Sequence, residues 1–256
     1  MTISPLTFLR ALLRFLAFVP LTLGYALVAL ALFTLNRDKP EIIDPVFRAW
    51  ARAMMPLLGI DLELRGEFPR ERTLIMPNHR SYADVVPFPA YTFVTFVAKI
   101  EVSRWPFIGF CCRVVHTVFV DRSDPESRKT TRAEIKRRLE EGYSILVYPE
   151  GTTAQAPEIK PFRPGMFHVA ASGAIPIVPV AMEYAHPSDA FIGDDTFLPH
   201  FFRTFGKART PLRVSIGPPL RDPDGERLRE QVESWVRREA ASLREGFLQH
   251  PTSPVA

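Results

Sequence analysis

The chain has 256 residues, of which 46% are hydrophobic, and a formal net charge of +4. This length suits one sizeable domain with its own core, and the composition argues against a multi-span membrane protein. Only six of the 32 basic residues are lysines, so arginines dominate, and these suit phosphate, carboxylate and anionic lipid surfaces. We expect no nucleic-acid partner, because no recognition-helix, zinc or RNA-binding signature is present. The two cysteines, Cys111 and Cys112, are adjacent, which excludes a disulfide framework, and no metal-ligand spacing occurs.

The N-terminal part contains an apolar run that carries no charge. This run extends from Phe15 to Leu35 and has 21 residues. As a helix it would be roughly 31 Å long, which is about the hydrocarbon thickness of a bilayer. Arg10 and Arg14 precede the run, and Arg37 and Lys39 follow it.

Three interpretations fit this run. It could be a secretory signal peptide, with Ala-Leu-Ala at residues 29–31 as the cleavage site. It could also span the bilayer, or enter one leaflet and stay there. The cations on both flanks give no orientation by the positive-inside rule, and two cytoplasmic ends would satisfy that rule without a crossing. We expect a retained anchor in the inner (plasma) membrane, with the folded domain on the cytoplasmic side.

The segment from Asp44 to Leu58 shows apolar residues at helical spacing, with Arg48 and Arg52 on the other face. Two interpretations are open for this helix. It could pack on the domain as an ordinary helix, or lie in the interface with its apolar side in lipid. Either way, residues 1–58 are predicted to form a membrane-associated helical segment.

From residue 59 onward the chain alternates between strand and helix patterns, which predicts an α/β domain over residues 59–246. We expect a mixed, mostly parallel sheet flanked by helices, followed by a flexible tail over residues 247–256. Ligands of such sheets bind at the carboxyl ends of the strands. The expected strands are Asp61–Arg65, Thr73–Met76, Thr92–Ala98, Thr117–Val120, Ser144–Tyr148, Ile177–Met182 and Leu212–Ile216. The expected helices are Tyr82–Pro89, Pro125–Glu141, Gly165–Ala171 and Gly225–Arg244.

A candidate general base follows the second expected strand, where residues 78–84 read Asn-His-Arg-Ser-Tyr-Ala-Asp. On a regular helix, five positions turn by about 500°, so His79 and Asp84 would not share a face. They can meet if His79 lies in a loop and Asp84 in the first turn of a helix capped by Ser81. An imidazole oriented by a carboxylate is a base suited to neutral pH.

The chain offers no recognisable enzyme nucleophile beside this base. No Gly-x-Ser-x-Gly elbow is present, and Ser81 suits a cap better than an attacking group. The base is therefore expected to deprotonate a hydroxyl group of the substrate. A second notable stretch, Tyr148–Thr152, follows another apolar run, so both stretches lie at expected strand ends.

These residues resemble the glycerolipid acyltransferase family of the lysophosphatidate acyltransferase type. Residues 78–84 resemble its NHxxxxD block, and three further blocks follow in the family's order over roughly residues 57–220. A segment between the last two blocks also resembles the family's Phe-Lys-x-Gly. The later blocks are Phe119–Arg122, Tyr148–Thr152 and Val178–Val180, and the intervening segment is Phe162–Gly165.

The resemblance implies transfer of a fatty acyl group from an acyl-CoA or acyl-ACP thioester to the hydroxyl of a lysolipid. Such a reaction needs no metal, no cofactor and no covalent acyl-enzyme. The catalytic roles would fall to His79 as base and Asp84 as its orienting partner. The expected substrate-binding residues are Arg122, Glu150, Gly151, Thr152 and Arg163, together with Lys99, which follows an expected strand as a further anion contact.

Structural roles stay open for several of these residues. Arg122 could form a surface ion pair, and Glu150 with Gly151 could form only a turn. Val178–Val180 is interpreted as core with a proline at a strand edge. Two other functions also remain open, namely a hydrolase of thioesters or lipids and a non-catalytic lipid-binding protein.

Three departures from the family pattern concern the acceptor. His116 stands where the second block usually has glycine, and we expect it to reshape the acceptor pocket. Thr153-Ala154 replaces the usual Arg-Ser, which removes a cation suited to a phosphate monoester. Arg163 replaces lysine and is followed by the extra Pro164. The expected acceptor is 1-acylglycerol-3-phosphate, and the alternative is a lyso-ornithine lipid, because acyltransferases of that lipid share the Pro-Glu-Gly-Thr-Thr stretch.

Overall fold

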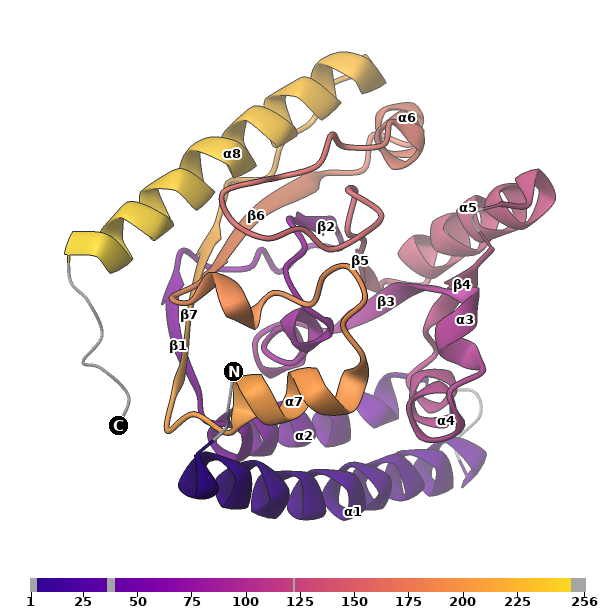
Figure 1. The fold of residues 1–256 in the computed structure, drawn as a ribbon. Helices are drawn as coiled ribbons and strands as arrows, with labels where there is room; N and C mark the ends of the chain where they lie inside the picture. The colour runs from indigo at the N-terminus through magenta and orange to yellow at the C-terminus, as the bar shows by residue number, and fades with distance from the viewer. Residues whose placement is uncertain (1–3, 36–39, 122, 250–256) are drawn as a thin grey trace.

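The computed structural model describes residues 4–35, 40–121 and 123–249. Its centre is a seven-stranded sheet in the order β1-β7-β6-β2-β5-β3-β4 (Figure 1). All neighbouring strands pair in parallel except β6 and β7, which are antiparallel. The predicted mixed, mostly parallel sheet is therefore confirmed. The strands are β1 (Ile60–Arg65), β2 (Leu74–Pro77), β3 (Val94–Lys99), β4 (Val118–Val120), β5 (Ser144–Leu146), β6 (Ile177–Tyr184) and β7 (Thr210–Ile216).

Helices cover both faces of the sheet. Successive side chains of a central strand point to opposite faces, and in these strands the side chains on both faces are buried. In β6, Val178 and Val180 belong to the core between the sheet and the helices α1, α2 and α7. Ile177 and Ala181 belong to the core between the sheet and the helices α5, α6 and α8. Figure 1 shows these two helical layers on opposite sides of the sheet. The helices are α1 (Pro5–Leu35), α2 (Asp44–Leu58), α3 (Ile100–Ser103), α4 (Pro106–Val114), α5 (Pro125–Glu140), α6 (Gly165–Ser172), α7 (Phe197–Phe205) and α8 (Gly225–Gln249).

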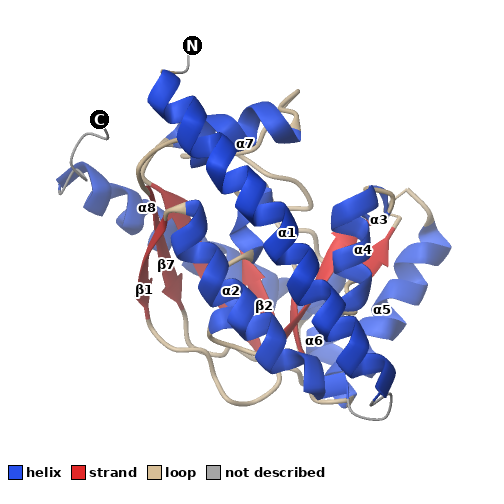
Figure 2. Cartoon of the chain, turned by 90° about the horizontal axis from the view of Figure 1, so that it is seen from below, coloured by secondary structure: helices blue, strands red, loops and turns tan. Residues whose placement is uncertain are grey.

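The first helix, α1, lies across the domain and packs on it from end to end (Figure 2). Near its start Arg14 donates hydrogen bonds to the carbonyls of Phe205, Lys207 and Ala208, at 2.8, 2.6 and 3.0 Å. Near its end the ring of Phe33 lies 4.6 Å from that of His116. The flanking cations Arg37 and Lys39 lie outside the described residues.

The second helix, α2, packs between α1 and the domain. Its apolar residues Ala51, Met54 and Leu58 are buried in protein, and Trp50 donates a hydrogen bond of 3.1 Å to Thr22 of α1. The interpretation with this apolar side in lipid is therefore wrong. The Arg52 side chain remains exposed on the opposite face.

Several elements differ from the sequence prediction. The expected helix Tyr82–Pro89 is two 3₁₀ turns, Tyr82–Val85 and Phe88–Ala90, because prolines at 87 and 89 lack the donors that a longer helix needs. The short helices α3, α4 and α7 were not predicted, since each is too short to show a clear period. Two more 3₁₀ turns occur at Pro40–Ile43 and Pro187–Asp189.

The last helix continues past its predicted end. It reaches Gln249 because the ring of Phe247 is buried beneath the Arg213 guanidinium, 4.0 Å from the ring centroid. The predicted tail therefore does not begin at residue 247, and residues 250–256 lie outside the described part.

Candidate active site

The candidate site begins where β2 ends, and Asn78 fixes the direction in which the chain leaves that strand. Its side-chain amide donates to the carbonyl of Met182 at 2.9 Å and accepts from the N–H of Met182 at 2.8 Å. Asn78 is fully buried, so both bonds are shielded from water. This pair ties the loop after β2 to the neighbouring strand β6.

The loop brings His79 and Asp84 together as the spacing predicts. The distance from His79 Nδ1 to Asp84 Oδ2 is 2.9 Å, and the contact joins a loop residue to the first turn of a short helix. Ser81 caps that turn in a capping box with Asp84, as expected. Because a carboxylate only accepts hydrogen bonds, Nδ1 carries the proton and Nε2 keeps a free lone pair.

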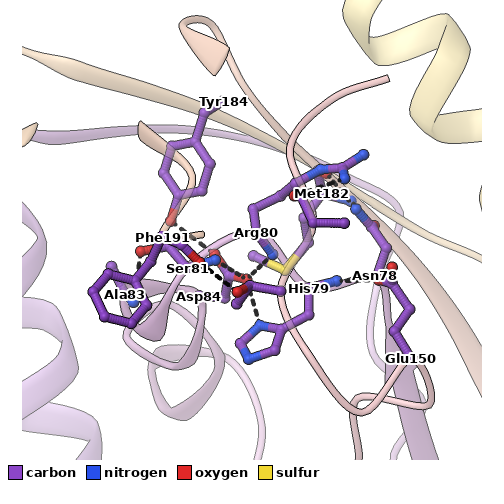
Figure 3. Close-up of polar contacts among 12 residues, drawn as sticks. Asn78, His79, Arg80, Ser81, Ala83, Asp84, Glu150, Met182, Tyr184 and Phe191 are labelled. Atoms are coloured by element: carbon purple, nitrogen blue, oxygen red, sulfur yellow. Dashed lines mark hydrogen bonds and ion pairs between the residues drawn. The ribbon is translucent and has the colours of Figure 1, made fainter. Parts of the chain in front are cut away.

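Asp84 is fully buried and accepts hydrogen bonds from four donors. Besides the imidazole, its Oδ2 accepts from the backbone N–H groups of Arg80 at 2.6 Å and Ser81 at 2.9 Å. Its Oδ1 accepts from the hydroxyl of Tyr184 at 2.9 Å. These bonds hold the carboxylate in one orientation and, through it, the imidazole (Figure 3).

An aromatic ring supports the imidazole from one face. The Tyr148 ring stacks on His79 with 3.7 Å between centroids and 16° between planes. Burial raises the pKa of the Tyr148 hydroxyl well above its usual value, so the ring stays neutral. No role was predicted for Tyr148 or Tyr184, and the available signal for Tyr148 was an aromatic residue at the end of an expected strand.

Glu150 supports the loop of residues 78–84 through the backbone of His79. One carboxylate oxygen accepts the backbone N–H of His79 at 2.6 Å, and the other accepts that of Lys160 at 2.6 Å. The side chain is buried, and burial raises the pKa of the Glu150 carboxyl to about 7. Since Glu150 is not among the cavity-lining residues, its geometry indicates positioning of the loop rather than direct contact with a ligand.

Three of the other predicted binding residues, Lys99, Gly151 and Thr152, line a cavity. Gly151, with φ of 75°, lies so close to Arg163 that an added Cβ would come within 2.7 Å of its Nε, so this turn requires glycine. The Arg163 side chain is exposed. Lys99 and Thr152 are exposed and line the cavity beside His79. Arg122 lies outside the described residues.

The cavity has a volume of about 570 Å³ and extends from the site along the helical layer that contains α1, α2 and α7. Its wall runs from His79 and Lys99, at the carboxyl edge of the sheet, to Thr117, directly before β4. Most of the lining side chains are apolar, including Phe18 of α1 and Trp50 of α2. This shape suits a long apolar ligand with its reactive end at His79.

His116 does not itself line the cavity, although its neighbours Val115 and Thr117 do. It precedes β4 at the amino end of the strand, with its ring against Phe33, whereas Lys99 stands at the carboxyl edge of the neighbouring strand. The expectation that His116 reshapes the acceptor pocket stays a prediction. Its φ of 57° explains why glycine suits this position, because residues with a Cβ rarely adopt such a backbone.

Thr153 occupies the position where the resemblance implies an arginine. Its hydroxyl donates to the carbonyl of Phe191, and the next residue, Ala154, donates its N–H to the carbonyl of His79 at 2.9 Å. Position 153 therefore supplies no cation to this wall. Within residues 4–35, 40–121 and 123–249, no group of three or more His, Cys, Asp or Glu side chains could hold a metal ion.

Comparisons with known proteins agree with this geometry. The Acyltransferase family model matches residues 60–183. The lyso-ornithine lipid O-acyltransferase of Pseudomonas aeruginosa is 30% identical, with 88% of this chain and 90% of that protein covered. The 1-acyl-sn-glycerol-3-phosphate acyltransferase of Limnanthes alba is 30% identical, with 66% and 57% covered. The crystal structure of the 1-acyl-sn-glycerophosphate (LPA) acyltransferase PlsC from Thermotoga maritima has the same fold, with a TM-score of 0.68, 21% identity, and 96% and 97% covered.

The raised pKa of Glu150 predicts a pH-dependent difference in stability between wild type and Glu150→Gln. The folded carboxyl, with a pKa of about 7, holds its proton more tightly than the unfolded one near 4.5. Wild-type stability therefore falls as pH rises through this window, by on the order of 3 kcal/mol at most, while the glutamine contributes no such change. Urea denaturation of both proteins across the window measures this.

The matched control is Glu158→Gln, which removes an exposed carboxyl from the same loop. Its stability relative to wild type should not change with pH across the same window. A pH-independent difference between wild type and Glu150→Gln would show that this carboxyl keeps an ordinary affinity for its proton in the folded protein.

Proposed function

Given that the chain belongs to the glycerolipid acyltransferase family, we propose that it moves a fatty acyl group from a thioester to the free hydroxyl of a lysolipid. The observation that carries the proposal is the free Nε2 of His79, which faces an apolar cavity while Nδ1 is held by Asp84. The donor is acyl-CoA or acyl-ACP. No metal or further cofactor takes part in the proposed reaction.

The proposed reaction is a direct transfer. His79 Nε2 takes the proton of the acceptor hydroxyl as its oxygen attacks the thioester carbonyl. The tetrahedral intermediate then breaks its carbon–sulfur bond, and the imidazolium returns the proton to the leaving thiolate. Asp84 stabilises the imidazolium between these steps, and the stacked Tyr148 ring keeps the imidazole ring of His79 in its orientation. An ester and a thiol are the products.

The apolar cavity supports this assignment because it can take a fatty acyl chain. Each buried methylene contributes about 0.8 kcal/mol, so a long chain in such a wall gains considerable affinity. Lys99 and Thr152 at the mouth are placed to meet the polar part of a substrate.

We propose a lyso-ornithine lipid as the acceptor. The P. aeruginosa relative acts on that lipid by name, and similar proteins from Rhizobium meliloti and Rhodobacter capsulatus carry the same name. The neutral Thr153 supports this choice, because it supplies no cation for a phosphate monoester. The second candidate acceptor is 1-acylglycerol-3-phosphate, which is favoured by the L. alba relative.

We also propose that the protein is bound to one leaflet of a membrane. By length and composition α1 could cross a bilayer, and it is the one helix among the described residues that could. Its packing favours a position in the plane instead, since rings along α1 contact the domain at Phe15–Phe201, 5.4 Å, and Phe18–Phe107, 6.3 Å. A crossing helix or a cleaved signal peptide would remove part of the cavity wall. The domain then faces the cytoplasm of the inner (plasma) membrane.

Replacement of His79 by alanine should lower kcat by about 10²- to 10⁴-fold, which is the usual contribution of a general base. Release of free thiol from acyl-CoA or acyl-ACP in the presence of lysolipid, with purified protein in detergent, measures it. The matched control is His168→Ala, which removes an exposed histidine from α6 and should leave the rate unchanged. Turnover near the wild-type rate in His79→Ala would contradict the mechanism.

A panel of acceptors tests the substrate assignment. With lyso-ornithine lipid, kcat/KM should exceed that with 1-acylglycerol-3-phosphate by at least about tenfold, which corresponds to roughly 1.4 kcal/mol. Thr153→Arg should reduce this ratio, because it adds a cation to the cavity wall. A reversed ratio in wild type would favour the phosphate acceptor, and thioester loss that ignores added lysolipid would favour a hydrolase.

Charges on the outer face of α1 should release the protein from vesicles. Leu13 and Leu16 are 58% and 59% exposed, and the variant Leu13→Asp/Leu16→Asp places carboxylates where lipid is proposed. We expect at least a tenfold loss of binding in co-sedimentation with anionic phospholipid vesicles. Leu248→Asp, at a 78% exposed leucine of α8, should bind like wild type. Equal binding of all three proteins would contradict the proposed orientation.

A further inference from the structure

A fully buried arginine lies next to the proposed base. Arg80 is 1% exposed, although a guanidinium is always charged and is rarely found inside a protein. It does not line the catalytic cavity, and the proposed acyl transfer does not use it. Its position therefore needs a separate explanation.

The contacts of Arg80 join its own loop, residues 78–84, to three other segments. Its guanidinium donates to the carbonyl of Ala154 at 3.0 Å and to that of Glu158, both in the loop after β5. A further bond of 2.6 Å goes to the Glu183 carboxylate on β6. Its own carbonyl accepts the N–H of Phe191 at 2.8 Å.

These contacts place the loop after β5 relative to the base. Ala154 receives a bond from the Arg80 side chain and donates its own N–H to the carbonyl of His79 at 2.9 Å. The same loop supplies Gly151 and Thr152 to the cavity wall. A shift of this loop would therefore move the wall of the site against the imidazole.

The buried ion pair is a costly way to achieve stability alone. Glu183 is 1% exposed, and burial raises the pKa of its carboxyl, while the charge of Arg80 opposes that rise. Buried ion pairs often contribute no more stability than apolar side chains of similar volume. The planar guanidinium, however, reaches two loop carbonyls and one carboxylate at fixed angles, which neither an apolar side chain nor a lysine can do.

We propose that Arg80 is a positioning residue, which holds the loop of residues 150–158 in register with the proposed base, His79. This inference rests on the proposed function, because it assumes that His79 is the base. The Glu150 carboxylate accepts the N–H groups of His79 and Lys160, and the charges of Arg80 and Asp84 act on it from further away.

Loss of the Arg80 charge should also have an electrostatic effect, which a pH–rate profile can measure. Arg80 is one of the groups that lower the pKa of Glu150 from the value burial alone would give. Without Arg80 the Glu150 carboxyl keeps its proton to higher pH, and a protonated carboxyl cannot accept from both backbone N–H groups. The acid limb of the pH–rate profile should then move to higher pH.

The test compares Arg80→Gln, Arg80→Lys and the double variant Arg80→Met/Glu183→Leu with wild type. The double variant removes both charges and is expected to fold with near wild-type stability. We expect kcat to fall about 10- to 100-fold in Arg80→Gln and in the double variant, because sub-ångström to ångström displacements cost such factors. KM for the donor should change less than about threefold, and the acid limb should shift to higher pH. Arg80→Lys should recover the pH profile but only part of kcat.

The matched control is Arg244→Gln. Arg244 lies 3.4 Å from the same Glu183 carboxylate but contacts neither loop of the site in the described structure, so its loss should change kcat less than about twofold. Wild-type kcat and pH profile in the folded double variant would overturn the inference, since Arg80 would then serve only the fold. Full turnover in His79→Ala would overturn the proposed base instead, so the two failures are distinguishable.

Discussion

The hydrogen bonds of the buried Asp84 carboxylate organise the rest of the site. Two backbone N–H groups, one imidazole and one tyrosine hydroxyl converge on its two oxygens. A buried carboxylate needs such partners, because an unpaired charge without water is strongly unfavourable. The loop after β2 must therefore curl around Asp84, and this curl turns His79 toward the cavity. Asn78 supports it from behind by fixing the end of β2 to β6.

A second set of contacts joins this loop to the one after β5. Glu150 accepts a hydrogen bond from the N–H of His79, and the N–H of Ala154 donates one to the carbonyl of His79. The Tyr148 ring stacks on the His79 ring. The proposed base, His79, is thus held through its backbone and its ring by a segment that lies some seventy residues later. β2 and β5 are neighbours in the sheet, so their carboxyl ends meet at one edge.

The N-terminal helix connects the site to the proposed membrane surface. One side of α1 contributes Phe18 and Ala26 to the cavity wall, while the other side exposes leucines. In the proposed placement on one leaflet, α1 lies between the lipid and the cavity. With one side on the domain and the other on the proposed lipid surface, an apolar helix of this length can pack along the domain and need not cross a bilayer.

The sequence by itself determined the α/β class, most strands and the His79–Asp84 pair, because each depends on local patterns. Alternating apolar residues mark strands, and a capped turn five residues long brings an imidazole and a carboxylate together. The contacts of Glu150, Tyr148 and Arg80 were decided only by the tertiary structure. Their partners are distant in the chain, and strand order, which no local pattern specifies, brings them together. The same reason placed His116 beside Phe33 and turned the apolar face of α2 inward.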